Sequence, residues 1–135
     1  MICDRLRGDR ERGASTVELV AFTPLLMLAI LVIVQLALTW YGNELAGAVA
    51  REAARVVRTG GGTPESAQDA RARAIEFAEQ IGGTSLTDLA VVVERPDDLT
   101  VRVTVTGRAV EIVQGMAPGV SATVHGPVEG FRADR

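Results

Sequence analysis

Hydrophobic and polar positions divide the chain into one long apolar segment near its beginning and shorter, mixed segments after it. Residues 19–43 read LVAFTPLLMLAILVIVQLALTWYGN and contain no charged side chain. As a helix they would extend about 37 Å, which is enough to cross a hydrocarbon core about 30 Å thick. Trp40 and Tyr41 lie near the end of the segment, and such rings favour the headgroup layer. The pattern therefore predicts one membrane-spanning helix.

Two other interpretations of this segment are a buried core helix and a secretory signal. A core helix does not fit, because the rest of the chain has too little apolar surface to surround it. A secretory signal does not fit, because its apolar region has about 7–15 residues before a small-residue cleavage site. Within the span, Pro24 leaves the Val20 carbonyl without its usual donor. Gln35, near the middle, either bonds to a neighbouring helix or is tolerated as a single polar residue.

The helical pattern continues beyond the apolar segment over residues 44–58. Four alanines recur there at three- and four-residue spacing on one face, which we call the alanine face: Ala46, Ala50, Ala53 and Ala54. On another face, Glu52 is placed to pair with Arg55. Because small side chains let helices approach closely, the alanine face packs either against the protein's own domain, as part of a stalk, or against neighbouring subunits. The sequence leaves both possibilities open.

A glycine-rich segment, residues 59–63, ends this helix and is interpreted as a hinge. It does not match a phosphate-binding P-loop, because the lysine of that motif and its spacing are absent. Thr63 and Pro64 then provide an N-cap and a proline at the first helical position. A second helix is therefore predicted over residues 64–81, ending at the glycine pair 82–83.

The last third of the chain has the pattern of β-strands. Four segments are strand candidates: residues 89–94, 99–106, 109–114 and 120–125. A turn-forming sequence at residues 95–98 joins the first two. His125 has no ligand partners at metal-binding spacing and is expected on a strand surface. The elements together predict an α+β fold, with a long N-terminal transmembrane helix that continues as a stalk, a short helix, and a small antiparallel sheet of three to four strands.

Composition narrows the classes of function. The net charge is −3, whereas a nucleic-acid-binding protein would normally carry a basic face. One cysteine and one histidine are too few for a metal site or a nucleophile–base pair. We therefore expect no enzymatic activity, metal, cofactor, small-molecule substrate or nucleic-acid partner. Cys3 precedes the apolar segment, whereas a bacterial lipoprotein cysteine follows one, so Cys3 is expected to be inert.

The residues just before the apolar segment carry the most specific pattern, RGASTVE at positions 12–18. An acid at the edge of a membrane span is costly unless it has a partner. Glu18 lies five residues beyond Gly13, after a short leader with a small basic excess. This arrangement resembles a prepilin processing site, with cleavage after glycine and glutamate as the fifth mature residue. Gly8 does not fit the same pattern, because charged residues would occupy the first four mature positions.

A longer pattern strengthens this resemblance. Arg-Gly-x-x-x-Val-Glu, an apolar run with an early proline, and AREAAR at residues 50–55 together resemble the TadE-like family. These proteins are minor pilins, or pseudopilins, of the Flp (tight-adherence) pilus and secretion apparatus. The resemblance is strong over residues 12–58 and weak afterwards. Ala14 stands where major prepilins of other classes commonly have phenylalanine, so the resemblance does not extend to N-methylation of that residue.

The resemblance implies an organisation and a set of partners. A membrane prepilin peptidase would cleave between Gly13 and Ala14 on the cytoplasmic side. The chain would then comprise a cleaved cytoplasmic leader (1–13), a transmembrane and stalk helix (14–58), the hinge (59–63) and an extracytoplasmic domain (64–135). Besides the peptidase and membrane lipid, the expected partners are other pilins and the pilus assembly platform. The mature protein would remain in the cell membrane as a single-pass protein or enter an extracellular pilus.

Glu18 has a physical role that suits such an assembly. After cleavage, the ammonium group of Ala14 would lie in or near the hydrocarbon. The Glu18 carboxylate of a neighbouring subunit would pair with it, offset the desolvation of both charges and set the axial stagger of the helices. Alternatively, Glu18 only stabilises a helix N-terminus, by about 0.3–1 kcal/mol. The alternative function is a generic single-pass anchor that presents a small extracytoplasmic domain to an unrelated envelope complex, and it predicts an intact N-terminus.

Overall fold

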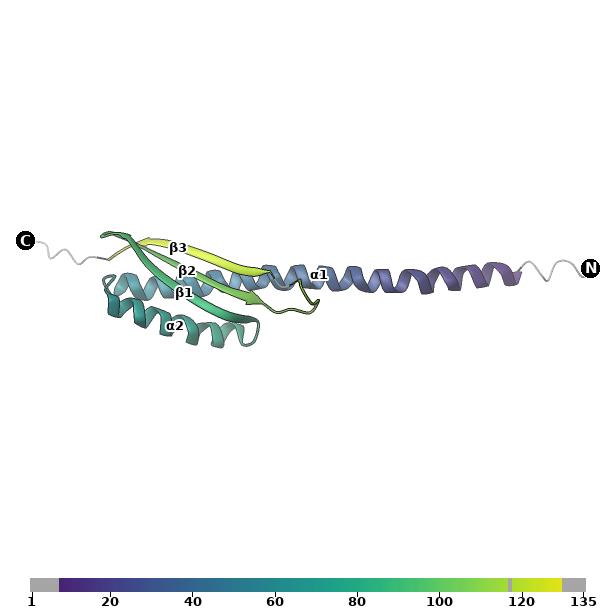
Figure 1. Ribbon diagram of the computed structural model, residues 1–135, viewed down its shortest axis with the longest axis horizontal. Helices are drawn as coiled ribbons and strands as arrows, with labels where there is room; N and C mark the ends of the chain where they lie inside the picture. Colours follow the sequence, from purple (N-terminus) through teal and green to yellow (C-terminus); the bar gives the residue numbers. More distant parts are fainter. Residues whose placement is uncertain (1–7, 117, 130–135) are drawn as a thin grey trace, which may run out of the picture. The chain divides into compact units, whose positions relative to one another are not determined.

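The computed structural model describes residues 8–116 and 118–129, with side chains described from Thr16 onward. Its elements are α1 (Gly8–Thr59), α2 (Pro64–Gly82), β1 (Leu86–Asp97), β2 (Thr100–Ala109) and β3 (Gly119–Pro127) (Figure 1). The α+β class, with a long apolar N-terminal helix, a second shorter helix and an antiparallel sheet, is confirmed. Cys3 and the first half of the expected leader lie outside the described residues.

The chain divides into two compact units, Met1–Val34 and Gln35–Arg135, so that α1 contributes to both. The second unit begins at Gln35, within the segment predicted to be the transmembrane and stalk helix (14–58). The reason is that the segment predicted to be a stalk is part of the core of this domain, where its alanines are buried. The domain thus consists of the second half of α1, α2 and the sheet.

The first unit is the N-terminal half of α1. The helix begins at Gly8, inside the segment predicted to be the cleaved leader, and Arg10, Glu11 and Arg12 there are good helix formers. Pro24 lies within the helix without ending it, and the Thr23 hydroxyl donates to the Leu19 carbonyl oxygen at 2.7 Å. By length and composition the helix can cross a membrane, and no residue of its most apolar window is buried.

The core of the second unit is built from small and β-branched side chains. On the two helices the fully buried residues are Ala46, Val49, Ala50, Ala53, Ala70 and Ala74. The second helix begins as the sequence predicts: the Thr63 hydroxyl accepts a hydrogen bond from the Ser66 amide at 3.2 Å, and Pro64 opens the helix. It ends at Gly82, and Gly83 follows with φ 51°.

The glycine-rich segment between the helices, predicted as a hinge, forms a turn that packs against its surroundings. Gly61 and Gly62 have φ values of 71° and 67°, a region that glycine adopts without steric cost. The Gly62 amide donates to the Val57 carbonyl at 2.9 Å. A Cβ on Gly60 would lie 2.4 Å from the Ser66 Cβ. The glycines are therefore required by a tight connection between two helices that pack side by side.

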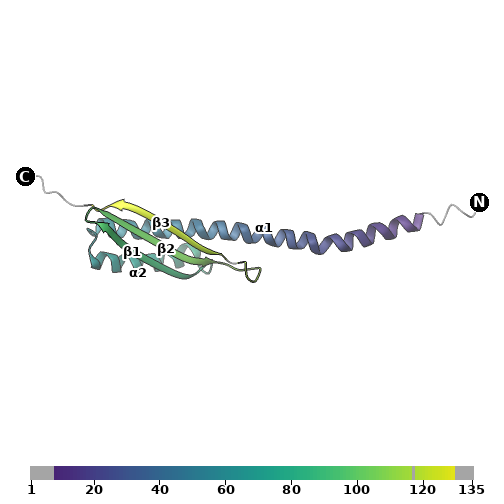
Figure 2. The ribbon, with the colours of Figure 1, turned by 45° about the horizontal axis from the view of Figure 1, so that its top comes forward.

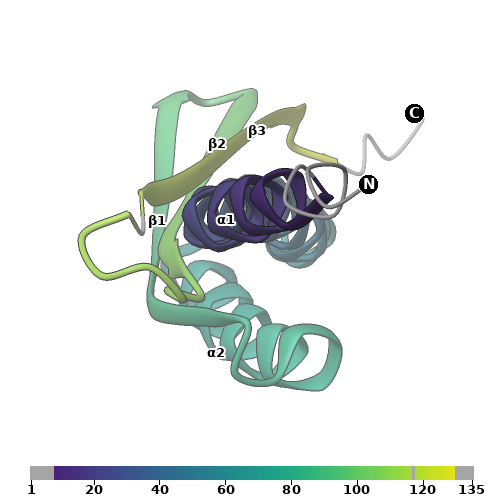
Figure 3. The ribbon, with the colours of Figure 1, turned by 90° about the vertical axis from the view of Figure 1, so that its right-hand side faces the viewer.

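The sheet is antiparallel with strand order β1-β2-β3. On β2, Val101, Val103 and Val105 are buried while the residues between them face outward, as their alternation predicts. Seen along α1, both helices lie on the same face of the sheet (Figure 3). The α2 helix contacts β1, and Gly42 of α1 lies against Ala109 and Val120 of β2 and β3.

The predicted and observed strands differ most at two places. The first strand begins at Leu86 rather than residue 89, because Asp88 has φ 52° and the register shifts between Thr87 and Ala90. Such a bulge interrupts the alternation of inward-facing and outward-facing residues by which a strand is predicted from the sequence. The predicted strand at residues 109–114 is wrong: Ala109 ends β2 and a loop follows. The reason is that this loop bonds to α1 instead of to a neighbouring strand.

Candidate functional site

The residues predicted to be processed lie within the first turns of α1. Gly13 and Ala14 are both helical in the structure, and their side chains are outside those described. Cleavage between them would remove the helical residues 8–13 and make Ala14 the first residue of the helix. Processing itself stays a prediction.

Glu18 lies one turn further along α1 and is exposed. Its neighbours Val17 and Leu19 are 70% and 68% exposed, so the carboxylate is surrounded by uncovered apolar surface. None of the ion pairs among the described residues includes Glu18. It is also the only charged residue between Thr16 and Asn43. This geometry leaves the carboxylate accessible to a group from another molecule.

The alanine face, by contrast, is covered by the protein's own domain. Ala46, Ala50 and Ala53 are 0% exposed, and Ala54 is 4% exposed. They belong to one hydrophobic cluster with residues of α2, β2 and β3. Of the two interpretations left open by the sequence, the structure therefore shows packing on the protein's own domain. A neighbouring subunit has no access to these four side chains while the domain is folded.

A charged network borders this packed face and joins the two helices. The Glu52 carboxylate pairs with Arg55 at 2.8 Å, as predicted, and with Arg73 of α2 at 3.4 Å. Arg73 also pairs with Glu76 at 2.9 Å. The hydrogen bond from Arg55, followed by the contact with Arg73, lowers the pKa of the Glu52 carboxyl below its usual value. The network therefore favours the ionised form of Glu52 in the folded protein.

Two arginines form hydrogen bonds at the end of the domain where the turn between α1 and α2 lies. Arg58 donates from Nε to the Pro127 carbonyl at 2.9 Å and so attaches α1 to the end of β3. Arg95 on β1 donates to the carbonyls of Gly62 at 2.8 Å and Asp98 at 3.2 Å. Both guanidinium groups thus bond to backbone carbonyls, and their role here is structural.

Gln35 holds the opposite end of the domain. Its side chain is 1% exposed, and its Nε2 donates to the Val110 carbonyl at 3.0 Å. Its Oε1 accepts from the amides of Ile112 at 2.9 Å and Val113 at 3.3 Å. The sequence suggested either a bond to a neighbouring helix or a single polar residue tolerated in the span, and neither describes what the structure shows. Its partners are the backbone groups of the loop between β2 and β3.

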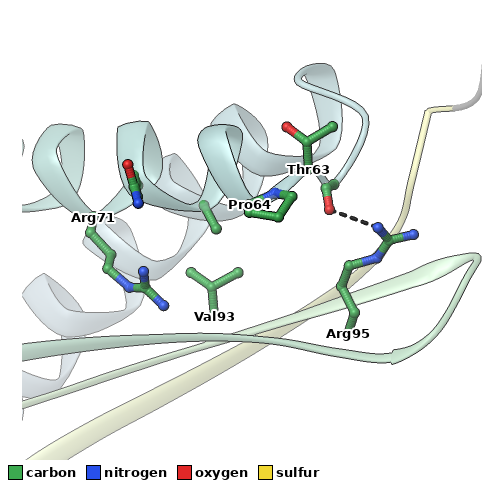
Figure 4. A pocket seen from close by; sticks show the side chains of 8 residues that line it. Thr63, Pro64, Arg71, Val93 and Arg95 are labelled. Atoms are coloured by element: carbon green, nitrogen blue, oxygen red, sulfur yellow. Dashed lines mark hydrogen bonds between the residues drawn. The ribbon is translucent and has the colours of Figure 1, made fainter.

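A cleft of about 340 Å³ lies between the start of α2 and β1. Figure 4 shows Arg71 beside Val93 on one side, and Arg95 reaching toward the helix turn on the other. Arg95 is occupied by its bond to Gly62, and Arg71 is exposed. The cleft therefore has no buried polar group directed at a ligand. Among the described residues, no cluster of His, Cys, Asp or Glu is suited to hold a metal ion.

Comparison with known proteins supports one family. Residues 13–55 match the family model of TadE-like proteins. The match begins at Gly13, the residue that precedes the expected cleavage, and ends within the alanine-bearing part of α1. It confirms the resemblance drawn from the sequence over this part of the chain. No curated protein and no solved structure gives a significant match.

Proposed function

We propose that this chain is a membrane-anchored minor pilin or pseudopilin that takes part in assembly of a Flp (tight-adherence) pilus or its secretion apparatus. The TadE-like match over residues 13–55 carries the proposal. That match covers the glycine of the processing motif, Glu18 and the apolar half of α1 within one stretch. A generic anchor would need the apolar helix but not the glycine and the acid at this spacing.

The proposed sequence of events starts on the cytoplasmic side. A prepilin peptidase cleaves the bond between Gly13 and Ala14, with the second unit on the opposite side of the membrane. Cleavage creates an ammonium group on Ala14 near the hydrocarbon, where an unpaired charge is costly. The exposed Glu18 carboxylate of a neighbouring subunit pairs with that group. Because each subunit provides one ammonium and one carboxylate, the pair fixes the axial offset between adjacent helices.

The exposed surface of the first unit supports this arrangement. From Thr16 to Val34 no described side chain is buried, and Phe22, Leu25, Leu26 and Ala29 line a shallow apolar hollow on this half of the helix. Such a surface is compatible with lipid before assembly and with neighbouring helices after it, since interhelical packing needs no hydrophobic driving force in a membrane.

N-terminal sequencing of membrane-extracted protein tests the proposal. In cells with an active Flp system, the mature chain should begin at Ala14, and Gly13→Val should block its formation. Gly8→Val is the matched control, because it makes the same change in the same segment away from the expected cleavage and should be processed normally. An intact N-terminus on the wild-type chain would overturn the proposal in favour of the generic anchor.

A further inference from the structure

The loop between β2 and β3 exposes apolar side chains near Gln35, the residue at which the exposed apolar half of α1 ends. Ile112 is 49% exposed and Met116 is 39% exposed. On α1, Leu36 is 62% exposed and lines a hollow together with Met116. Trp40, one turn further on the same side of the helix, is 69% exposed. We call Leu36, Trp40, Ile112 and Met116 the apolar collar.

The position of this collar along α1 is determined by Gln35. The three hydrogen bonds of its side chain attach the loop to the helix at that residue. Figure 2 shows the loop beside α1, at the opposite end of the sheet from the turn between β1 and β2. Gln35 follows directly on Val34, and α1 is continuous there. The loop therefore lies within about one helical turn of the end of the exposed apolar segment.

The length of that segment places the loop at the membrane surface. Residues 19–34 form about 24 Å of helix, which is shorter than a hydrocarbon core of about 30 Å. If the buried part is counted from Ala14 instead, it reaches about 32 Å, and Gln35 then stands at the edge of the hydrocarbon. Counted from residue 19, the segment ends inside the outer hydrocarbon, and counted from Ala14 it ends at the edge of the hydrocarbon, so the loop bound to Gln35 lies between the outer hydrocarbon and the lipid headgroups. It does not lie far out in water.

The loop has the chemistry that this depth requires. A segment that reaches the hydrocarbon must satisfy its backbone polar groups within the protein, because no water is available there. The amides of Ile112 and Val113 donate to Gln35, and the Met116 amide donates to the Val113 carbonyl at 3.0 Å. Between residues 110 and 118 the only charged side chain is Glu111, and its carboxylate accepts a hydrogen bond from the amide of Gly115.

We propose that the apolar collar is a second membrane contact, which seats the domain directly on the bilayer. Ile112 and Met116 contact lipid at the level of the headgroups and upper acyl chains, and Trp40 places its amphipathic ring in the same layer. The occupant of the collar is lipid, because Leu36 and Trp40 follow closely in sequence on the apolar segment that the proposed function places in the membrane. The domain would then be fixed in height and tilt relative to the membrane, instead of standing away from it on a stalk. This inference rests on the membrane anchoring included in the proposed function.

Site-directed spin labelling of the full-length chain tests the inference. The chain carries Cys3→Ser, so that a single new cysteine is labelled, and is reconstituted as one copy per nanodisc of phosphatidylcholine and phosphatidylglycerol. The test position is Ile112→Cys. The matched control is Leu99→Cys, which replaces an apolar residue that is 76% exposed in the turn between β1 and β2. The ten residues of β2 separate the two sites, which corresponds to about 30 Å.

The readout is collision of each nitroxide with lipid-soluble oxygen and with a water-soluble nickel chelate. The label at Ile112 should favour oxygen and collide several-fold less with the chelate than the label at Leu99. Met116→Cys repeats the test if Ile112→Cys does not fold. Equal exposure of both labels to the chelate would overturn the inference while leaving the anchor intact. Shielding of the Ile112 label from both reagents would also overturn it, because protein would then cover the collar. Failure of the chain to insert would overturn the anchor and the collar together.

Discussion

The two halves of α1 belong to one helix, but the first half is exposed and the second has a buried face. Before Gln35 the described side chains are apolar and uncovered, and Glu18 is their only charge. After Gln35, small side chains are buried against α2 and the sheet, and Glu52 pairs with Arg55 and with Arg73 of α2 along the border. The same backbone thus serves as a surface for other molecules in one half and as part of a domain core in the other.

This difference shows why an alanine pattern does not identify an assembly surface by itself. Small residues permit close approach of any helix, and in the second half of α1 the partner is α2 of the same chain. Assembly contacts are therefore expected from the first half, where Glu18 and its apolar neighbours are exposed. The following predictions test this division of roles.

The largest effect is expected from Glu18→Ala in the first half of α1. Membrane insertion should be retained, because it depends on the apolar run and not on one boundary carboxylate. Assembly should be strongly impaired, because truncating one member of a buried pair costs about 3–5 kcal/mol. Crosslinking to partner pilins and counts of surface pili measure the loss. Glu18→Asp should be intermediate, since it keeps the charge and shortens its reach. Crosslinking of Glu18→Ala at the wild-type level would show that Glu18 is only a helix-terminal acid.

An identical substitution in each half compares the two surfaces directly. Ala50→Leu should destabilise the domain by about 1–3 kcal/mol, because the added atoms enter a packed core. Ala50 is 0% exposed, whereas Ala29 is exposed, so Ala29→Leu should leave the stability of the domain nearly unchanged. Thermal unfolding in detergent, followed through the β-sheet signal, should show a decrease on the order of 5–15 °C for Ala50→Leu alone. Equal decreases for both variants would contradict the division of α1 at Gln35.

Local signals in the sequence predicted most of the elements. Thr63 and Pro64 identify the start of α2, because capping and proline at the first helical position act within one turn. The alternating valines of β2 identify its buried face for a similar reason. The resemblance to TadE-like proteins likewise rests on a continuous stretch, which the family match confirms.

Features that depend on distant partners were not predictable in the same way. The bonds of Gln35 are to residues 75–78 positions later in the chain, so the sequence shows a polar residue in an apolar segment but not the loop to which it bonds. The same loop explains the wrong strand at residues 109–114. The glycine turn was interpreted as a hinge because its contacts with Ser66 and Arg95 arise only when the helices and sheet pack.

The smallest predicted effect is a pH dependence of domain stability, which arises from the ion pairs of Glu52 in the second half of α1. The pKa of Glu52 is lowered in the folded state by its hydrogen bonds with Arg55 and Arg73. The contribution of ionised Glu52 to the stability of the domain should therefore be complete above the usual carboxyl pKa of 4.5. It should be lost as the pH falls through the lower pKa that Glu52 has in the folded protein. We expect less than about 1 kcal/mol, because the network lies near the surface.

Unfolding of the full chain in detergent at pH 7 and at pH 3 measures this contribution. Glu52→Gln should lower stability at pH 7 and reduce the difference between the two pH values, since the amide does not titrate. Asp69→Asn is the matched control: it neutralises an exposed acid on α2 that is in none of the ion pairs described. If both variants change the pH dependence equally, the effect reflects the general loss of negative charge. Only a larger change for Glu52→Gln would assign it to the contact between α1 and α2.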